Sequence, residues 1–304
     1  MGAEIQRVAA VTVHIGVNPI LWSNDDLREL GGETPLESCL AQARQVGFQG
    51  IELGHKFPRE AGVLRATLAP FGLACVSGWY SAALLRRDAE AELTALRPHL
   101  DLLKAMKCPV LIFAETSNAV HGDMAIPLSR RPVLGPEDWA GFGRKLTAVA
   151  EATLAEGVRL VYHHHMGTVV QSGQDIAALM AATGPAVHLV LDTGHAVFAG
   201  VDPTALATQY RERISHVHAK DVRREVRLQA RESDWSFLRA VLEGVFTVPG
   251  DGMIDYTSVF RALRGYSGWI VLEAEQDPKK ANPLEYATAG YRALRRLLTK
   301  GALR

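Results

Sequence analysis

The chain has 304 residues, 48% of them hydrophobic, and its 33 basic and 33 acidic residues give a formal net charge of +0. This balance gives no reason to expect a nucleic acid or an anionic membrane as partner. No apolar run reaches the 18 residues that a bilayer span needs, and the first seven residues lack the layout of a signal peptide. The three cysteines form no CxxC pair, which is typical of reduced thiols. We therefore expect a cytoplasmic protein with one domain over residues 1–304.

Short β-rich apolar runs alternate with stretches of helical periodicity along the whole chain. Several runs are continuously apolar, which is typical of strands that are covered on both faces, as in a parallel sheet. Eight such units predict a single (β/α)8 TIM barrel rather than a doubly wound sheet. The predicted strands are residues 11–17, 50–53, 73–76, 110–113, 159–162, 187–191, 214–217 and 269–272.

Several helix ends are marked by local sequence signals. Thr34 to Glu37 reads as a capping box with proline at the first helical position, and that helix should stop at Gly47. Asp202-Pro203 starts a second helix in the same way, and Asp255 should cap a third. The last helix is expected over residues 284–298.

Two connections are long for links between a strand and the next helix. They cover residues 116–134, after the fourth strand, and 223–252, after the seventh. Loops at the carboxyl end of a barrel usually carry the functional site. Both segments are therefore candidates for a lid or for part of a pocket.

Ionisable residues gather where the last four predicted strands end. Because side chains alternate along a strand, His163 shares a face with His165, as His216 does with His218 and Glu273 with Glu275. Imidazoles and carboxylates at the mouth of a barrel are what a divalent cation and its substrate need. The motifs are Tyr162-His163-His164-His165, Asp192-Thr193-Gly194-His195, His216-Val217-His218-Ala219-Lys220-Asp221 and Glu273-Ala274-Glu275.

One inward ligand from each of these four strands would form a mixed nitrogen and oxygen set. Such a set suits Mn²⁺, Co²⁺, Fe²⁺ or Zn²⁺ better than Ca²⁺. The predicted metal ligands are His163, Asp192, His218 and Glu273.

Each motif alone also has a structural interpretation. Asp192 before Thr-Gly is typical of a turn residue or a helix cap, and the triple histidine could be a surface loop. Of the two histidines in His-x-His, one could be buried and the other exposed, and the two glutamates could be a solvated strand end. Four such coincidences at consecutive strand ends are improbable together, so we favour the metal site.

His195 and Lys220 are candidates for proton transfer, because a metal site can shift a histidine or a lysine toward neutrality. Alternatively, Lys220 is a surface charge paired with Asp221. Polar and aromatic residues near the ends of the first strands could form the pocket wall for a hydroxyl-rich ligand. These are Asn18, Trp22, Glu52 and Trp79-Tyr80.

The four motifs resemble those of the xylose-isomerase-like sugar isomerase/epimerase superfamily, whose TIM barrels hold one divalent metal at strands five to eight. Within it the chain is most similar to the inosose dehydratases of myo-inositol catabolism. His163 stands where most members of the superfamily carry a metal-binding glutamate, and His165 could bind the metal in its place. The stretches that carry the likeness are spread over nearly the whole chain: 16–22, 50–54, 162–168, 191–195, 246–252 and 271–278.

The resemblance implies loss of water from 2-keto-myo-inositol to give a trihydroxycyclohexane-dione, with a polyol ketone as the small-molecule substrate. Manganese or cobalt would bind the ketone oxygen, while His195 and Lys220, with Glu275 in reserve, would transfer protons. His165 would then face the substrate. Glutathione is associated with the family, and no residue here predicts a site for it.

Two other functions remain open. A metal-dependent ketose epimerase or isomerase on the same barrel would share the enediolate but would re-protonate carbon. A sugar-binding protein without catalysis would bind metal and show no activity. Barrel enzymes often form homo-oligomers, but the sequence shows no discrete apolar interface.

Overall fold

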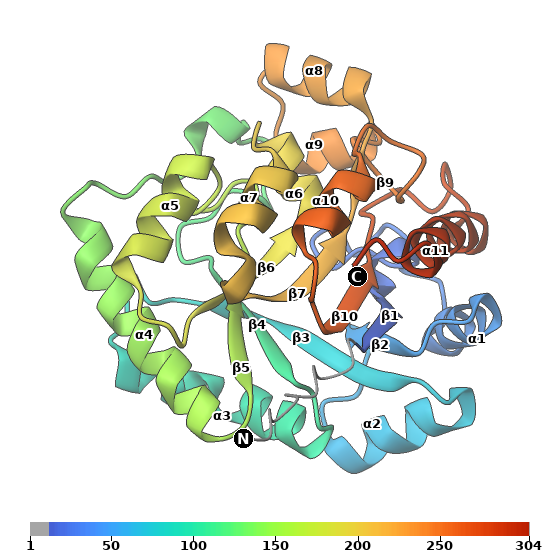
Figure 1. Ribbon diagram of the computed structural model, residues 1–304, viewed down its shortest axis with the longest axis horizontal. Coiled ribbons are helices and arrows are strands. Elements are labelled where there is room, and N and C mark those ends of the chain that lie inside the picture. The colour runs from blue at the N-terminus through green and yellow to red at the C-terminus, as the bar shows by residue number, and fades with distance from the viewer. Residues whose placement is uncertain (1–11, 304) are drawn as a thin grey trace, which may run out of the picture.

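The computed structural model describes residues 12–303, and within them eight parallel strands close into a barrel (Figure 1). The first and last strands pair in register from Val13 opposite Gly268 to Val17 opposite Leu272, which closes the ring. The strands are β1 (Val13–Val17), β2 (Gly50–Leu53), β3 (Ala74–Ala82), β4 (Val110–Glu115), β5 (Arg159–Tyr162), β6 (His188–Asp192), β7 (Ile214–Ala219) and β10 (Gly268–Leu272). The fold is therefore the predicted TIM barrel.

Helices surround the barrel, and none of those in the described residues is both long enough and apolar enough to cross a membrane. Most lie outside the strands that they connect, and α8 stands out from the top of the molecule in Figure 1. The helices are α1 (Leu36–Val46), α2 (Ala61–Leu68), α3 (Ala89–Ala105), α4 (Asp138–Ala155), α5 (Gly173–Ala182), α6 (Thr193–Phe198), α7 (Pro203–Tyr210), α8 (Arg224–Glu232), α9 (Phe237–Leu242), α10 (Tyr256–Ala262) and α11 (Pro283–Thr299).

The barrel interior is layered along the strand direction. Val110, Ile112, Val161 and Val190 form a small buried apolar cluster. Two residues further along the same strand faces come His163 after Val161 and Asp192 after Val190. Because inward side chains recur every second residue, the histidines and carboxylates occupy the layer above this apolar plug, at the carboxyl ends of the strands.

The two long connections, residues 116–134 and 223–252, are joined to each other and are called the roof below. Leu128 N donates to Trp235 O at 3.2 Å, and Ser129 N donates to Asp234 Oδ1 at 3.1 Å. The second segment contains α8, α9 and β9 (Phe246–Thr247), which pairs antiparallel with β8 (Asp221–Val222). Both segments contribute side chains to the site, as the lengths of the connections indicated.

Most predicted elements match the structure closely. The strands at 50–53 and 159–162 have the expected bounds, whereas β3 continues from Val76 to Ala82 and Val11 lies outside the described residues. Asp202 and Asp255 cap α7 and α10 as expected. The capping box at Thr34 was wrong, because α1 begins after Pro35 without any side-chain cap.

Candidate active site

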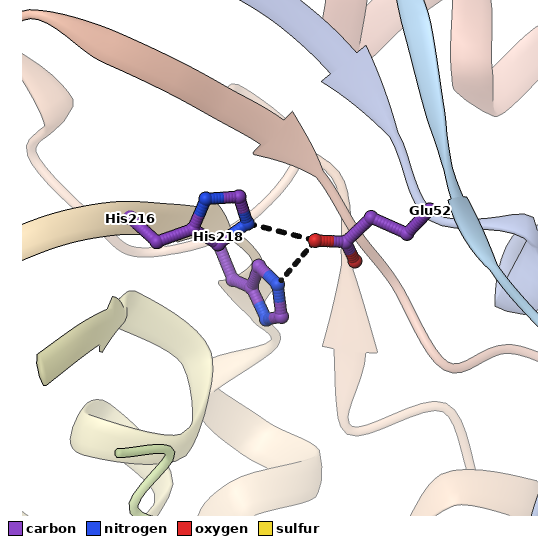
Figure 2. Close-up of side chains that lie close together, drawn as sticks. All are labelled: Glu52, His216 and His218. Atoms are coloured by element: carbon purple, nitrogen blue, oxygen red, sulfur yellow. Dashed lines mark hydrogen bonds and ion pairs between the residues drawn. The ribbon is translucent and has the colours of Figure 1, made fainter. Parts of the chain in front are cut away.

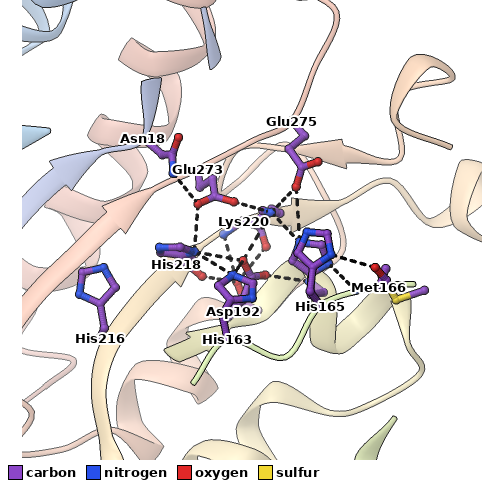
Figure 3. Close-up of polar contacts among 12 residues, drawn as sticks. Asn18, His163, His165, Met166, Asp192, His216, His218, Lys220, Glu273 and Glu275 are labelled. Atoms are coloured by element: carbon purple, nitrogen blue, oxygen red, sulfur yellow. Dashed lines mark hydrogen bonds and ion pairs between the residues drawn. The ribbon is translucent and has the colours of Figure 1, made fainter. Parts of the chain in front are cut away.

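The four predicted metal ligands meet in one place at the carboxyl end of the barrel (Figure 3). Asp192 Oδ2 lies 3.4 Å from both His163 Nε2 and His218 Nδ1. The two imidazole nitrogens are 3.2 Å apart, and His218 Nδ1 is 2.9 Å from Glu273 Oε2. We call these four residues the cage. All four are buried.

His163, Asp192 and His218 lie close enough together to share a divalent cation, and Glu273 adjoins them through His218 Nδ1. A cation that holds nitrogen and oxygen ligands at about 2.1 Å keeps neighbouring ligand atoms about 3.0 to 3.4 Å apart. Asp192 Oδ2 is buried and makes no hydrogen bond, although it faces two imidazole nitrogens. A buried carboxylate oxygen without a hydrogen bond is costly unless a positive charge is near, and the Lys220 ammonium lies 3.4 Å from this one.

Asp192 also begins a helix. Its Oδ1 accepts a hydrogen bond of 2.7 Å from His195 N and so caps α6. The helix-cap interpretation is therefore confirmed, and the second carboxylate oxygen remains free to face the cage.

The structure separates the two candidate histidines on β5. His163 Nε2 points to Asp192 and His218, whereas the His165 ring lies 3.9 Å, centroid to centroid, from the ring of His195. His165 Nδ1 donates to Met166 O at 2.8 Å. In the neutral ring Nε2 therefore carries no proton and can accept a hydrogen bond. All three consecutive histidines are buried, so the surface-loop interpretation is wrong.

Lys220 lies beside the cage in a second cluster of ionisable groups. Its Nζ donates to Glu275 Oε1 at 2.7 Å and to His195 Nε2 at 3.0 Å, and it is 2.5 Å from Glu273 Oε1. Lys220 is fully buried, so it is not a surface charge. Asp221, its expected partner in that alternative, instead accepts backbone hydrogen bonds from Val222, Gly250 and Ile254.

The electrostatic environment shifts the pKa values of Lys220 and His195 in opposite directions. Burial alone would lower the pKa of Lys220, but the carboxylates of Asp192, Glu273 and Glu275 outweigh burial and raise the pKa above its usual value. Burial and the nearby Lys220 charge lower the pKa of His195 well below its usual value. The expected shift toward neutrality therefore holds for His195 and is wrong for Lys220, which stays an ammonium.

A pocket with about 600 Å³ of empty space, including its open mouth, leads to the cage. His165 and Glu275 line the pocket, and Glu275 Oε2 is buried without a hydrogen-bond partner. Lys220 and His195 do not line the pocket and lie behind Glu275.

Not every residue predicted for the pocket wall lies there. Asn18 and Glu52 line the pocket and are hydrogen-bonded to each other at 2.8 Å. Trp22 does not line it, because its indole is buried and donates to Gln42 Oε1 on α1 at 2.6 Å. Trp79 does line the pocket, and its ring meets those of His163 and His165 edge-on.

The roof supplies site residues that the sequence analysis did not single out. The ring of His121 lies 5.0 Å from that of His165, and His121 also lines the pocket. Phe237 packs beside His121, 5.0 Å from the His165 ring and 5.7 Å from the His195 ring. His121 could have been identified from the sequence, because it is a histidine within the long connection 116–134. Nothing in the sequence distinguishes Phe237 from a core residue.

Comparison with known proteins identifies the family. The family model described as xylose isomerase-like TIM barrel matches residues 40–297. The rhizopine catabolism protein MocC of Rhizobium meliloti is 47% identical over 98% of this chain and 92% of its own length. An inosose dehydratase of Geobacillus thermodenitrificans is 45% identical over 90% of this chain and 94% of its own.

The solved structure of an L-ribulose 3-epimerase shares the fold, with a TM-score of 0.66 and 18% identity over 96% of each chain. A probable 3-DHS dehydratase from Bacillus anthracis does so with a TM-score of 0.68 and 16% identity, covering 93% of this chain and 98% of its own. A closed barrel, a buried cage at its carboxyl end and relatives of nearly equal length agree. The chain belongs to the xylose isomerase-like TIM-barrel family.

Proposed function

We propose that this single-domain protein is a metal-dependent hydro-lyase that removes water from a polyhydroxylated cyclic ketone. The proposed reaction converts 2-keto-myo-inositol to a trihydroxycyclohexane-dione plus water. The observation that carries the proposal is the contact between the cage and the Lys220 cluster, where Nζ lies 2.5 Å from Glu273 Oε1. Relatives named inosose dehydratase, at 45% and 43% identity over most of the chain, support it.

The cage would hold the cation through His163 Nε2, Asp192 Oδ2, His218 Nδ1 and Glu273 Oε2. Mn²⁺ and Co²⁺ suit this mixed donor set. When bound, such a cation supplies a Lewis acid that stabilises negative charge on a ketone oxygen.

Glu275 is the residue of the second cluster best placed to take the proton from the carbon beside the ketone. Its Oε2 is unpartnered and the residue lines the pocket, while Oε1 is held by the Lys220 ammonium at 2.7 Å. The electron pair of that C–H bond forms the new C=C bond, and the C–O bond to the β-hydroxyl breaks. The enol so formed moves its hydroxyl proton to carbon and becomes the dione.

The departing oxygen takes a proton from the network of Glu275, Lys220 and His195, so that water leaves and the base is regenerated. Lys220 and His195 contact Glu275 from outside the pocket and act as its proton reservoir. An ammonium that touches Glu275 can return the proton without exposure to solvent.

His165 would accept a hydrogen bond from a substrate hydroxyl. Its Nδ1 proton is engaged by Met166 O, so Nε2 offers a lone pair in a pocket that also holds the Trp79 ring. Aromatic and polar surfaces of this kind suit a ring that carries many hydroxyls.

The experiment is an assay on scyllo-inosose that follows the appearance of the dione. We expect turnover that disappears on treatment with a chelator and returns with Mn²⁺ or Co²⁺. Ketoses tested in parallel for epimer exchange distinguish the alternative reaction. No dione from the metal-loaded protein, together with epimer exchange on a ketose, would contradict the proposal.

A further inference from the structure

We propose that Asn18 and Glu52, supplied by the first two strands beside β10, are positioning residues that set the affinity of the cage for the cation. The inference rests on the proposed metal site and deepens it, because neither residue is itself a ligand. Asn18 directly follows β1 and Glu52 lies on β2, whereas the cage is built from residues at the ends of β5, β6, β7 and β10.

Glu52 holds the far side of the His218 ring. Glu52 Oε1 lies 3.2 Å from His218 Nε2 and 2.7 Å from His216 Nε2 (Figure 2). A carboxylate only accepts, so the proton of His218 belongs on Nε2 when the ring binds a cation through Nδ1. Glu52 thereby selects the tautomer and the ring orientation that the cage requires.

Asn18 ties the same carboxylate to a second ligand. Its Oδ1 accepts from Ile20 N at 2.9 Å, which fixes the direction of the amide. The two protons on Nδ2 then go to Glu52 Oε2 at 2.8 Å and to Glu273 Oε2 at 3.0 Å. One amide therefore holds Glu52 and the cage glutamate at a fixed separation.

The four hydrogen-bond donors to Glu52 leave little freedom for movement. Ser77 Oγ also donates to Oε1, at 2.5 Å, and Glu52 itself is only 1% exposed. Buried hydrogen bonds of this kind cannot be exchanged for water when one partner is removed. Losing Glu52 should therefore misplace His218 directly and Glu273 through Asn18.

The two cage imidazoles differ in their outer contacts. His218 is oriented by a carboxylate, whereas His163 Nδ1 is buried without a hydrogen-bond partner. His216 touches Glu52 but lies to one side of the polar network in Figure 3. Glu52 therefore supports one of the two cage imidazoles and also holds the neighbouring His216, whereas His163 has no such support.

The test is Mn²⁺ binding to the purified protein, followed by electron paramagnetic resonance of the free ion and without any substrate. Glu52→Gln should weaken binding by roughly 10- to 100-fold, as loss of an outer partner of a metal ligand typically does. Asn18→Ala should weaken it in the same direction. Ser77→Ala is the matched control, because it removes a donor to the same carboxylate oxygen and leaves the His218 contact; we expect less than about a threefold change.

Affinity within twofold of wild type for both Glu52→Gln and Asn18→Ala would overturn the inference while leaving the proposed function intact. Failure of the wild-type protein to bind Mn²⁺ at all would instead remove the metal site itself. If Glu52→Gln does not fold, ¹⁵N NMR of histidine-labelled wild-type protein loaded with Zn²⁺ decides the matter. We expect His218 to carry its proton on Nε2, and a proton on Nδ1 would contradict the inference.

Discussion

Asp192 uses the two oxygens of one carboxylate for two separate purposes. Oδ1 accepts from His195 N at the start of α6, and Oδ2 faces the cage without a hydrogen bond. The structural role needs only an acceptor, whereas the proposed metal role needs a negative oxygen. Substitutions at this residue can therefore separate folding from metal binding.

Asp192→Asn should leave the fold intact and abolish turnover. Asparagine caps a helix about as well as aspartate, so Asp192→Asn should keep the cap and lose only the ion pair between Oδ2 and Lys220 Nζ at 3.4 Å. Asp192→Ala removes the cap as well and should cost about 0.5–2 kcal/mol. Urea unfolding and the bound Mn²⁺ content measure both effects; Asp192→Asn protein with normal metal and activity would contradict the assignment.

Glu275→Gln should lose activity but keep the metal. Glu275 contacts Lys220 and lines the pocket, but the cage does not include it. Loss of a general base typically lowers kcat by roughly 10²- to 10⁴-fold. Steady-state kinetics on scyllo-inosose, with metal content measured on the same sample, test this. Unchanged kcat would remove Glu275 from the reaction.

At the level of secondary structure, the end of β7 connects the site to the roof. Lys220, which follows β7, points to the cage, and the next residue, Asp221, accepts backbone hydrogen bonds from Gly250 and Ile254, in the segment after β9. Gly252 packs against this anchor so closely that an added Cβ would lie 2.3 Å from Asp221 Oδ1 and 2.7 Å from Val222 O. A side chain at this position would push the roof away from the strand.

Gly252→Ala should therefore destabilise the protein by about 1–3 kcal/mol, as overpacking typically does. Gly122→Ala is the control, since a Cβ there would meet nothing within 4 Å and should change the unfolding free energy by less than about 0.5 kcal/mol. Thermal or urea unfolding of both variants makes the comparison. Equal stability of the two would show that the anchor is not tightly packed.

Elements with strong local signals were predictable from the sequence. The apolar runs at 50–53 and 159–162 end abruptly, and their bounds match β2 and β5. β3 was predicted too short because Ser77 and Gly78 break the apolar run while the backbone stays extended to Ala82. The Thr34 cap failed because a sequence pattern shows which atoms are available and not how the chain enters the helix.

At the scale of the whole molecule, closure of the barrel brings together residues that are far apart in sequence. Asn18 and Glu273 are separated by 255 positions yet hydrogen-bond at 3.0 Å. The alternation of side chains along a strand predicted which histidines and carboxylates point inward, and the structure brings together His163, Asp192 and His218, with Glu273 2.9 Å from His218. The alternation of side chains along a strand gives no information on contacts across the barrel. The hydrogen bonds from His216 and His218 to Glu52 therefore could not be predicted from the sequence.

The most direct measurement is anomalous X-ray diffraction from crystals of the protein grown with Mn²⁺. We expect one manganese peak per chain within about 2.5 Å of His163 Nε2, Asp192 Oδ2, His218 Nδ1 and Glu273 Oε2. A cage without a manganese peak in fully loaded crystals, or a peak held by other residues, would contradict the metal site on which the proposed chemistry depends.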